Sequence, residues 1–386
     1  MRTPWPQARR IARDVAKPLN AVTVPLAAAG GAALAAPLEA RIPQPSCDIA
    51  AMDGYAVAGP GPYLLVDRIL AGDARCTVLR PGQAAEIATG APVPAGTDAV
   101  IPYERARRDG AEISGTIAGR CHIRRRGEDF GAGQVLVAEG TVVSAPVAGL
   151  AAGLGHDALS VYRRPRVRAV LTGNELLLAG TPRPGRIRDA IGPMLPGLVR
   201  AAGGEVIDMA PCHDDAAALA HLLESADVDV LAVCGATSAG VADHLRTALA
   251  RMNAEIIIEQ VACRPGHPQL LAALPGGPFL VGLPGNPYAA LVAALTLLSP
   301  LLGTLAGRAV PPTVTAPLKE APAPHPRDTL LVAACWRDSA VVPVGNDRPG
   351  SLWAPAAADV LAVLPPDWTA PDWTGGTAEL LPLPGA

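Results

Sequence analysis

The strongest constraint on the fold is a regular alternation of strand-like and helix-like segments between residues 166 and 305. Short apolar runs predict buried strands, and longer segments with apolar residues on one face predict helices. Expected strands are 166–171, 205–209, 228–233 and 279–283, and expected helices are 194–202, 215–225, 243–252 and 287–298. Strands that alternate with helices in this way form an open, mostly parallel sheet covered on both faces.

The rest of the 386-residue chain does not continue this alternation. Residues 45–132 are rich in Gly and Pro and carry short apolar runs, which predicts a small β domain. Further helices are expected at 6–15, 26–36 and 140–155, and further strands at 330–335, 340–344 and 360–364. We therefore expect a multidomain α/β protein with an N-terminal helical and β-rich linker domain (1–44 and 133–163), an inserted β domain (45–132), an α/β domain (164–308) and a small C-terminal β domain (309–386).

Composition excludes several classes of protein. With 50% hydrophobic and 17% charged residues, the chain is too apolar for disorder, and a net charge of −3 gives no basic field for nucleic acid or anionic membranes. Residues 21–38 carry no charge, but they are mostly Ala and Gly, with Pro25 and Pro37 near the ends. We therefore reject a membrane span there. The first residues mix basic side chains with Asp14, unlike a secretory signal, so we expect a cytoplasmic protein with free thiols.

Three Gly-containing loops follow predicted strands of the α/β domain, at 172–175, 235–240 and 283–287. Ligands of open α/β sheets bind at the carboxyl ends of the strands, and Gly allows backbone N–H groups to approach an oxyanion closely. Asn286 followed by Pro287 predicts a helix N-cap and first turn in the same crevice. The loops predict an anion pocket, and the alternative is ordinary turn chemistry between strands and helices.

Three acids lie beside these loops: Glu175, Asp189 and Asp243. Carboxylates near an anion repel it unless a cation bridges them, and Mg²⁺ shares hard oxygen ligands with phosphate. The alternative is an N-cap role for Asp243 and a solvated position for Asp189.

The predicted β domain holds a second cluster of polar residues. Asp53 lies between apolar neighbours, Thr89 lies in a turn-rich loop, and three arginines at 124–126 are followed by Glu128 and Asp129. Arginine suits bidentate contacts with oxyanions, although a run of charges is more often a solvated surface.

At these positions the chain closely resembles the MoeA family. The matching segments are AMDGYAV (51–57), ATGAPVPAGTDAVIPYE (88–104), RRRGED (124–129), TGNEL (172–176), the loop 235–243, RPGHP (264–268) and LPGNP (283–287). The seven motifs occur in the same order as in the family, from the N-terminal half through the α/β domain. By this resemblance the α/β domain is identified as a molybdopterin-binding domain.

The resemblance implies an activity, a metal and a partner. Family members insert molybdenum from molybdate into adenylylated molybdopterin with Mg²⁺, release AMP, and work as homodimers with the cleft between the pterin domain of one subunit and the β domain of the other. Handover of substrate from the adenylyltransferase is a further expectation. The resemblance assigns catalytic roles to Asp53, Asp129, Glu175, Asp189 and Asp243, with Glu175, Asp189 and Asp243 as metal ligands. It assigns ligand contacts to Thr89, Thr172, Gly173, Gly235, Ser238, Gly240, Arg264, His267, Pro284, Gly285, Asn286 and Ser351.

The chain departs from the family pattern at the ligand site. The family usually has Asp-Ser-Asn at 189–191, Gly-Gly-Val at 235–237, Lys-Pro-Gly-Lys at 264–267 and Asp-Glu at 174–175, where this chain has Asp-Ala-Ile, Gly-Ala-Thr, Arg-Pro-Gly-His and Asn-Glu. If His267 faces the ligand, binding should weaken as the pH rises from about 6 to 8. The losses favour an alternative function, a non-catalytic paralogue that binds or delivers the cofactor, whereas the retained acids favour the enzyme. A third alternative is an adenylyltransferase with the same pterin fold.

Overall fold

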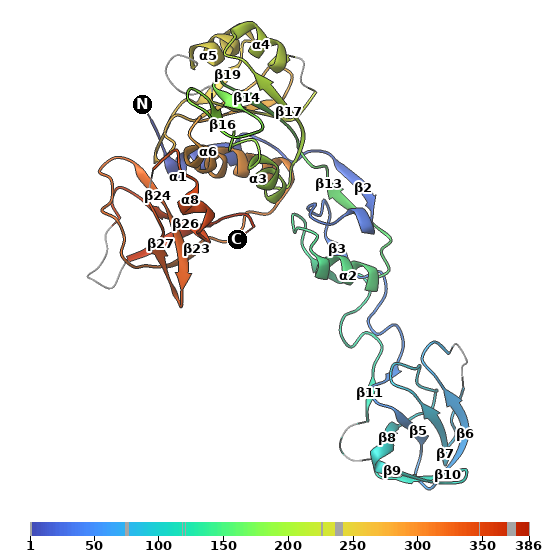
Figure 1. The fold of residues 1–386 in the computed structure, drawn as a ribbon. Coiled ribbons are helices and arrows are strands. Elements are labelled where there is room, and N and C mark those ends of the chain that lie inside the picture. The colour runs from blue at the N-terminus through green and yellow to red at the C-terminus, as the bar shows by residue number, and fades with distance from the viewer. Residues whose placement is uncertain are drawn as a thin grey trace.

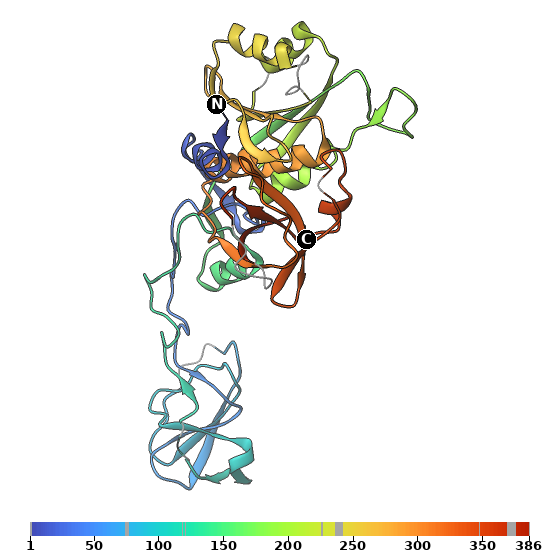
Figure 2. The same cartoon turned by 90° about the vertical axis from the view of Figure 1, so that its left-hand side faces the viewer.

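The protein is an elongated molecule with four parts arranged along the chain (Figures 1 and 2). The computed structural model describes residues 2–73, 77–117, 119, 121–224, 227–235, 242–346, 348–368 and 376–385, without the side chains of 242 and 243. The α/β domain and the C-terminal domain lie together at one end, a narrow linker domain follows, and the inserted β domain forms the opposite end. The expected fold class, a multidomain α/β protein, is confirmed.

The α/β domain is built on a six-stranded sheet with strand order β17-β14-β18-β22-β21-β19. Its four parallel strands are β14 (Arg166–Thr172), β17 (Glu205–Cys212), β18 (Val230–Cys234) and β22 (Phe279–Leu283). Two antiparallel strands, β19 (Glu255–Ile258) and β21 (Leu270–Ala273), extend one edge. The sequence did not predict these two, because four-residue apolar runs carry little periodicity.

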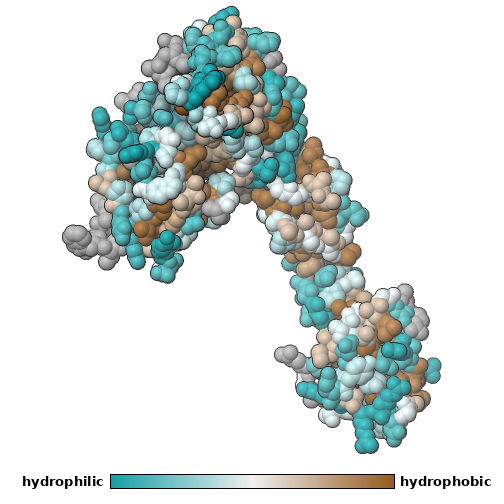
Figure 3. Space-filling model, viewed as in Figure 1, coloured by the Kyte–Doolittle hydropathy of each residue, from teal (hydrophilic) through white to brown (hydrophobic). Residues whose placement is uncertain are grey.

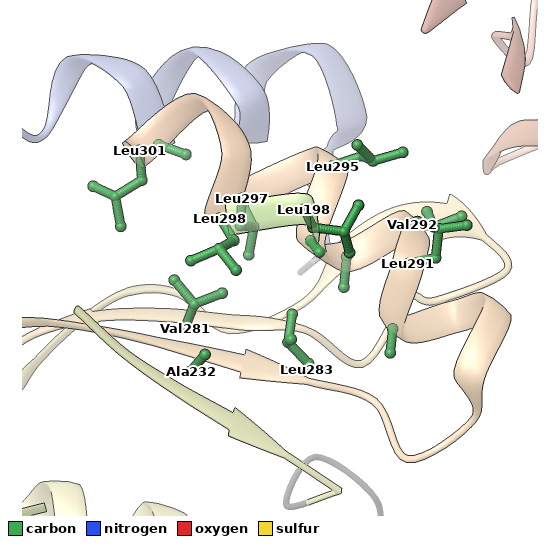
Figure 4. Packing of buried hydrophobic residues seen from close by; sticks show 14 of the residues in the cluster. Leu198, Ala232, Val281, Leu283, Leu291, Val292, Leu295, Leu297, Leu298 and Leu301 are labelled. Carbon is green, nitrogen blue, oxygen red and sulfur yellow. The ribbon is translucent and has the colours of Figure 1, made fainter. Parts of the chain in front are cut away.

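Helices cover both faces of this sheet. On one face lie α4 (Ala216–Glu224) and α5 (Ala242–Arg251), and on the other lie α3 (Leu195–Ala201), α6 (Pro287–Ala293), the π-helical turn η3 (Ala294–Leu298) and α7 (Ser299–Leu305). Leucines of the continuous helix Pro287–Leu305 pack on Val281 and Leu283 (Figure 4). This helix is long and apolar enough to cross a membrane, but 78% of its apolar window is buried, so it forms the core of the domain.

The N-terminal helix packs on the α/β domain, although its residues were expected in the linker domain. Helix α1 (Trp5–Asp14) contacts η3 and α7, and the indole Nε1 of Trp5 donates a hydrogen bond of 3.0 Å to Thr296 Oγ1. Trp5, Ala8 and Ala12 are buried, so one small apolar face of the helix lies against the core. The helix periodicity was predictable, but the partner of this face was not.

The linker domain contains pairs of strands and one helix. Strand β2 (Ala21–Pro25) pairs with β13 (Ala158–Tyr162), β3 (Leu38–Glu39) pairs with β12 (Val135–Val137), and α2 (Ala145–Gly153) packs on the 3-10 turn η1 (Leu26–Ala28). The helix expected at 26–36 is therefore wrong. The turn ends before Gly30 and Gly31, and Gly31 has a φ of +79°, which a helix cannot continue.

The inserted β domain is a six-stranded sheet with the order β8-β5-β7-β6-β10-β9. The strands are β5 (Gly54–Ala58), β6 (Tyr63–Ile69), β7 (Gln83–Ile87), β8 (Ala99–Pro102), β9 (Ala106–Asp109) and β10 (Glu112–Gly115), with a separate pair of β4 (Ile49–Ala50) and β11 (Ile123–Arg124) at the side of the linker domain.

The C-terminal domain closes into a small barrel. Its strands are β23 (Val314–Leu318), β24 (Thr329–Arg337), β25 (Ala340–Pro343), β26 (Val360–Leu364) and β27 (Gly376–Pro382), and the pairing of β24 with β26 completes the ring. The short helix α8 (Trp353–Ala356) precedes β26. Outside the ring, β24 also pairs with β20 (Val261–Arg264), and β20 pairs with β1 (Thr3–Pro4), which joins the barrel to the α/β domain and to the start of the chain.

Candidate active site at the carboxyl edge of the sheet

Three loops meet at the carboxyl ends of β14, β18 and β22. Thr172 Oγ1 donates a hydrogen bond of 2.8 Å to the carbonyl of Cys234, and Gly235 N–H donates one of 3.0 Å to the carbonyl of Leu283. Gly235 has a φ of +92°, and a Cβ there would lie 2.7 Å from the Thr172 carbonyl oxygen. A Cβ on Gly285 would lie 3.6 Å from Gly235 Cα. Glycine at 235 therefore lets the loops after β14 and β18 pack together, and Gly285 lies in ordinary contact with them.

The LPGNP loop is covered by the C-terminal barrel. Asn286 is the N-cap residue of α6 and Pro287 its first residue, as expected, but the Asn286 side chain makes no capping hydrogen bond. The carbonyl of Pro349 accepts hydrogen bonds from Tyr288 N–H at 2.9 Å and Ala289 N–H at 3.4 Å instead. The free N–H groups expected to face a ligand at this helix start are thus partly used by the barrel.

Ser351 lies in the same barrel loop. Its backbone N–H donates to the Arg348 carbonyl at 3.0 Å, and its Oγ accepts from Trp353 N–H at 3.3 Å. A Cβ on the neighbouring Gly350 would lie 3.6 Å from Asn286 Oδ1. The loop therefore brings Ser351 to the edge of the sheet where Asn286 and Gly285 lie.

The RPGHP loop follows β20 at the junction of the α/β domain and the barrel. Arg264 Nε donates a hydrogen bond of 2.8 Å to Oδ2 of Asp328, a carboxylate with a side-chain exposure of 4%. Burial of the imidazole lowers the pKa of His267, and the positive charge of Arg2 lowers it further, while Asp328 acts in the opposite direction. His267 is therefore neutral at pH 7 in the unliganded protein.

Two loops of the inserted β domain meet around Asp53. Its Oδ1 accepts a hydrogen bond of 2.6 Å from Thr89 N–H, and this bond, together with the Thr89 hydroxyl, lowers the pKa of the exposed carboxyl. Gly54 is required next to it, because a Cβ there would lie 2.0 Å from the Ile101 carbonyl oxygen. Asp53 is thus a fixed, ionised carboxylate at the surface.

The basic run of the β domain is engaged by neighbouring carboxylates. Arg124 is paired with Asp129, and Arg125 Nη1 lies 2.6 Å from Asp48 Oδ2. Asp48 also accepts from Arg126 N–H at 2.8 Å, and Glu128 accepts from Arg125 N–H at 2.8 Å. These contacts are those of a solvated, ion-paired surface loop, which was the alternative interpretation of the run.

Comparison with known proteins supports the resemblance seen in the motifs. Residues 3–155 match the family model described as the MoeA N-terminal region (domain I and II), and residues 168–304 match that of a probable molybdopterin binding domain. The chain is 36% identical over 316 residues to molybdopterin molybdenumtransferase 2 of Mycobacterium tuberculosis, which covers 76% of this chain and 77% of that protein. It is 34% identical over 303 residues to the molybdopterin molybdenumtransferase of Nostoc, covering 74% and 70%. A molybdopterin biosynthesis MoeA protein from Pyrococcus horikosii has a TM-score of 0.80 at 26% identity, covering 98% of both chains.

The chain belongs to the MoeA family.

The acids expected at the MoeA site have different surroundings. Asp189 is buried, and its carboxylate accepts from Ile191 N–H at 2.9 Å and Gly192 N–H at 3.1 Å, so the solvated alternative is wrong. Glu175 is exposed. Asp243 is the second residue of α5, and its side chain is outside the described part of the structure, as are Ser238 and Gly240.

A magnesium site is not assembled by the acids that the structure describes. Among the described residues, no group of three or more His, Cys, Asp or Glu side chains could hold a metal ion. Asp189 already accepts two backbone N–H groups.

The two halves of the expected MoeA site lie far apart in one chain. Asp53, Thr89 and Asp129 belong to the inserted β domain, and the three Gly-containing loops belong to the α/β domain at the opposite end (Figures 1 and 2). The linker domain separates them. One subunit therefore does not bring these two sets of residues together.

Sequence reasoning missed two residues beside the expected ligand loop, Arg2 and Asp328. Arg2 Nη1 lies 3.3 Å from Asp328 Oδ1, across 326 positions of sequence. Neither residue belongs to a motif, so no local pattern could mark them. Only the pairing of β1, β20 and β24 brings them to Arg264.

Proposed function

We propose that this MoeA-family protein is a molybdopterin molybdenumtransferase, which inserts molybdenum from molybdate into adenylylated molybdopterin and releases AMP in the last step of molybdenum cofactor biosynthesis. The observation that carries the proposal is the meeting of the Thr172, Gly235 and Gly285 loops at the carboxyl edge of a parallel sheet. Such edges bind nucleotide-like ligands in open α/β folds. The curated relatives with this name cover most of the chain.

The chain's own residues suit an anionic pterin nucleotide. Gly285 is exposed at this edge and carries no side chain, so phosphate oxygens can approach its backbone, whereas the N–H of Gly235 is used by the Leu283 carbonyl. Gly173, Pro284 and Asn286 belong to loops at the same edge, and the RPGHP loop contacts α6, because a Cβ on Gly266 would lie 2.8 Å from the Ala289 carbonyl oxygen. Ser238, Gly240 and Asp243 complete the expected contacts.

We propose a homodimer in which the β domain of one subunit meets the α/β domain of the other. The separation of Asp53 from the α/β loops within one chain supports it. The linker surface also supports it, because residues 141–155 carry no charge and α2 exposes Ala145, Pro146 and Ala152 (Figure 3). An exposed helix that is apolar on all sides is typical of an interface. Sedimentation should therefore give a dimer at micromolar concentration.

Three finer features are proposals on the family resemblance. We propose a requirement for Mg²⁺ with Asp243 as a ligand beside Asp189 and Glu175, a cytoplasmic location, and receipt of substrate from the adenylyltransferase. Chelation by EDTA should stop AMP release, and added Mg²⁺ should restore it.

A second function, a non-catalytic paralogue that binds or delivers the cofactor, is favoured by the position of Ile191. This residue replaces a polar family residue, and its side chain is buried in the core. The loss of that polar group removes a ligand contact without removing the fold. The adenylyltransferase alternative is disfavoured by the match of residues 3–155 to the MoeA N-terminal region.

One assay separates the enzyme from the paralogue. Purified protein is given adenylylated molybdopterin with and without molybdate, and AMP is measured. The enzyme releases AMP only when molybdate is present. A protein that binds the adenylylated substrate without AMP release is the paralogue.

A further inference from the structure

A buried carboxylate holds two arginines where the barrel meets the α/β domain. Asp328 Oδ2 accepts from Arg264 Nε at 2.8 Å, and Oδ1 accepts from Arg2 Nη1 at 3.3 Å. Arg2 precedes β1, Arg264 ends β20 and Asp328 precedes β24, and these strands are neighbours in the sheet. Arg2 Nη1 also lies 3.5 Å from Oδ2, the oxygen that Arg264 contacts, so one carboxylate holds the two guanidinium groups close together.

The cluster has one positive charge more than its buried acid neutralises. Asp328 N–H donates at 3.0 Å to Nδ1 of His325, so this nitrogen acts as an acceptor. His267, within electrostatic reach of both arginines, is neutral at pH 7. Two guanidinium groups therefore face one carboxylate.

Both arginines keep donors for an outside ligand. The side chain of Arg264 is 54% exposed and that of Arg2 is 38% exposed. A guanidinium group has five N–H donors, and Asp328 takes only the Nε donor of Arg264. Planar groups fixed in this way suit the oxygens of a tetrahedral oxyanion.

We propose that Arg2 and Arg264 form a seat for a tetrahedral oxyanion, with Asp328 as the positioning residue that fixes both guanidinium groups. The proposal rests on the proposed function in one respect, because molybdate and the phosphates of the adenylylated pterin are the oxyanions it would meet. Arg2 then supplies the positive charge that the RPGHP loop lacks at His267.

The seat is tested by binding alone, without turnover. Calorimetric titration with molybdate, and separately with inorganic phosphate, should show binding to the wild-type protein. Arg2→Gln should weaken it about tenfold, the loss of one charge-assisted contact. Arg10→Gln, an exposed arginine on α1, is the matched control and should leave the affinity unchanged. Equal affinities of wild type and Arg2→Gln would overturn the seat, as would a wild-type protein that binds neither ion in the millimolar range.

The positioning role of Asp328 is tested by whether removal of its charge weakens or strengthens molybdate binding. Removing a negative charge strengthens anion binding if Asp328 only repels the ligand. Asp328→Asn, in protein with a cooperative melting curve, should instead weaken molybdate binding, because the two arginines lose their common anchor. Tighter binding in that variant would overturn the positioning role. If Asp328→Asn does not fold, Asp328→Glu moves the carboxylate by one methylene and should give the same loss.

A final experiment distinguishes free molybdate from a pterin phosphate as the bound oxyanion. It also distinguishes failure of the oxyanion seat from failure of the proposed enzyme activity. Molybdate is titrated with and without bound adenylylated molybdopterin. A seat for free molybdate keeps its affinity when the pterin is bound, and a seat for a pterin phosphate is blocked. Arg2-dependent molybdate binding without any AMP release would overturn the enzyme and keep the seat. If Arg2→Gln keeps both AMP release and the wild-type affinity for molybdate, the oxyanion seat is overturned and the enzyme proposal stands.

Discussion

At Asp243, a structural role and a catalytic role predict different effects of substitution on stability and on AMP release. It is the second residue of α5, inside the first helical turn and not at the N-cap position, where a carboxylate can stabilise the helix start or ligate a cation. Asparagine keeps the shape of the side chain but lacks the charge that a hard cation needs. Asp243→Asn should therefore melt like wild type, bind molybdopterin, and lose AMP release by a factor on the order of a hundred. A matched control is Asp215→Asn, because Asp215 Oδ1 accepts from Ala218 N–H at 2.7 Å at the start of α4. Full turnover in Asp243→Asn would leave Asp243 only a structural role in the first turn of α5.

His267 should make ligand affinity depend on pH, and the pH range of this dependence should be lower than the RPGHP motif alone indicated. Burial and then Arg2 lower the pKa of the free imidazole, Arg264 lowers it further, and Asp328 opposes them. A bound oxyanion stabilises the imidazolium, so the bound pKa exceeds the free one. Affinity for the pterin nucleotide should therefore strengthen as the pH falls from the bound pKa of His267 to its free pKa, which lies below 6.5. Above the bound pKa the affinity should stay constant. His267→Lys should flatten the profile. An unchanged profile in that variant would place His267 outside the site.

Individual site residues were predictable where a short motif marks them. Asp53 and Thr89 come from separate motifs, and the structure joins them by a hydrogen bond of 2.6 Å. Arg2 and Asp328 carry no motif, and their contact depends on strands far apart in sequence. Residues marked by a short motif can be predicted from the sequence, whereas residues brought together only by distant strands cannot.

At the scale of elements, the loop after β18 predicts a matched pair of stability effects. Gly235→Ala would place a Cβ 2.7 Å from the Thr172 carbonyl oxygen at a φ of +92°, so it should destabilise the fold by about 1–3 kcal/mol. Gly285→Ala meets only an ordinary contact at 3.6 Å and should melt within a degree or so of wild type. Thermal unfolding of both variants checks the pair. Equal melting temperatures would show that the loops do not pack as described.

The elements of the α/β domain followed closely from periodicity, and their neighbours did not. Strand β22 has the predicted bounds, because a buried apolar run lies between turn residues. The predicted helix at 287–298 continues to Leu305 through η3 and α7. The capping of α6 by the carbonyl of Pro349 was beyond prediction, because a backbone acceptor from a distant loop leaves no mark in the residue types nearby.

At the scale of the whole molecule, subunit exchange tests where the site forms. Asp53→Asn and Asp243→Asn should each be inactive as homodimers. If the site lies between subunits, a mixed dimer has one site with both substitutions and one with neither. Random co-assembly makes half of the dimers mixed, so activity should return to about a quarter of wild type. Mixing wild type with an inactive variant is the control for exchange. No recovery, with mixed dimers present, would place the whole site within one chain.

The contact between Arg2 and Asp328 has a consequence for synthesis of the chain. Arg2 is synthesised before its acid, which follows 326 positions later. At usual elongation rates this takes roughly 15 to 65 seconds. For most of that interval α1 lacks its packing partners, because η3 and α7 are made only shortly before Asp328. A chain that terminates before the barrel therefore carries the pterin loops but leaves Arg2 and Arg264 without their shared acid, so an incomplete copy is unable to form the oxyanion seat.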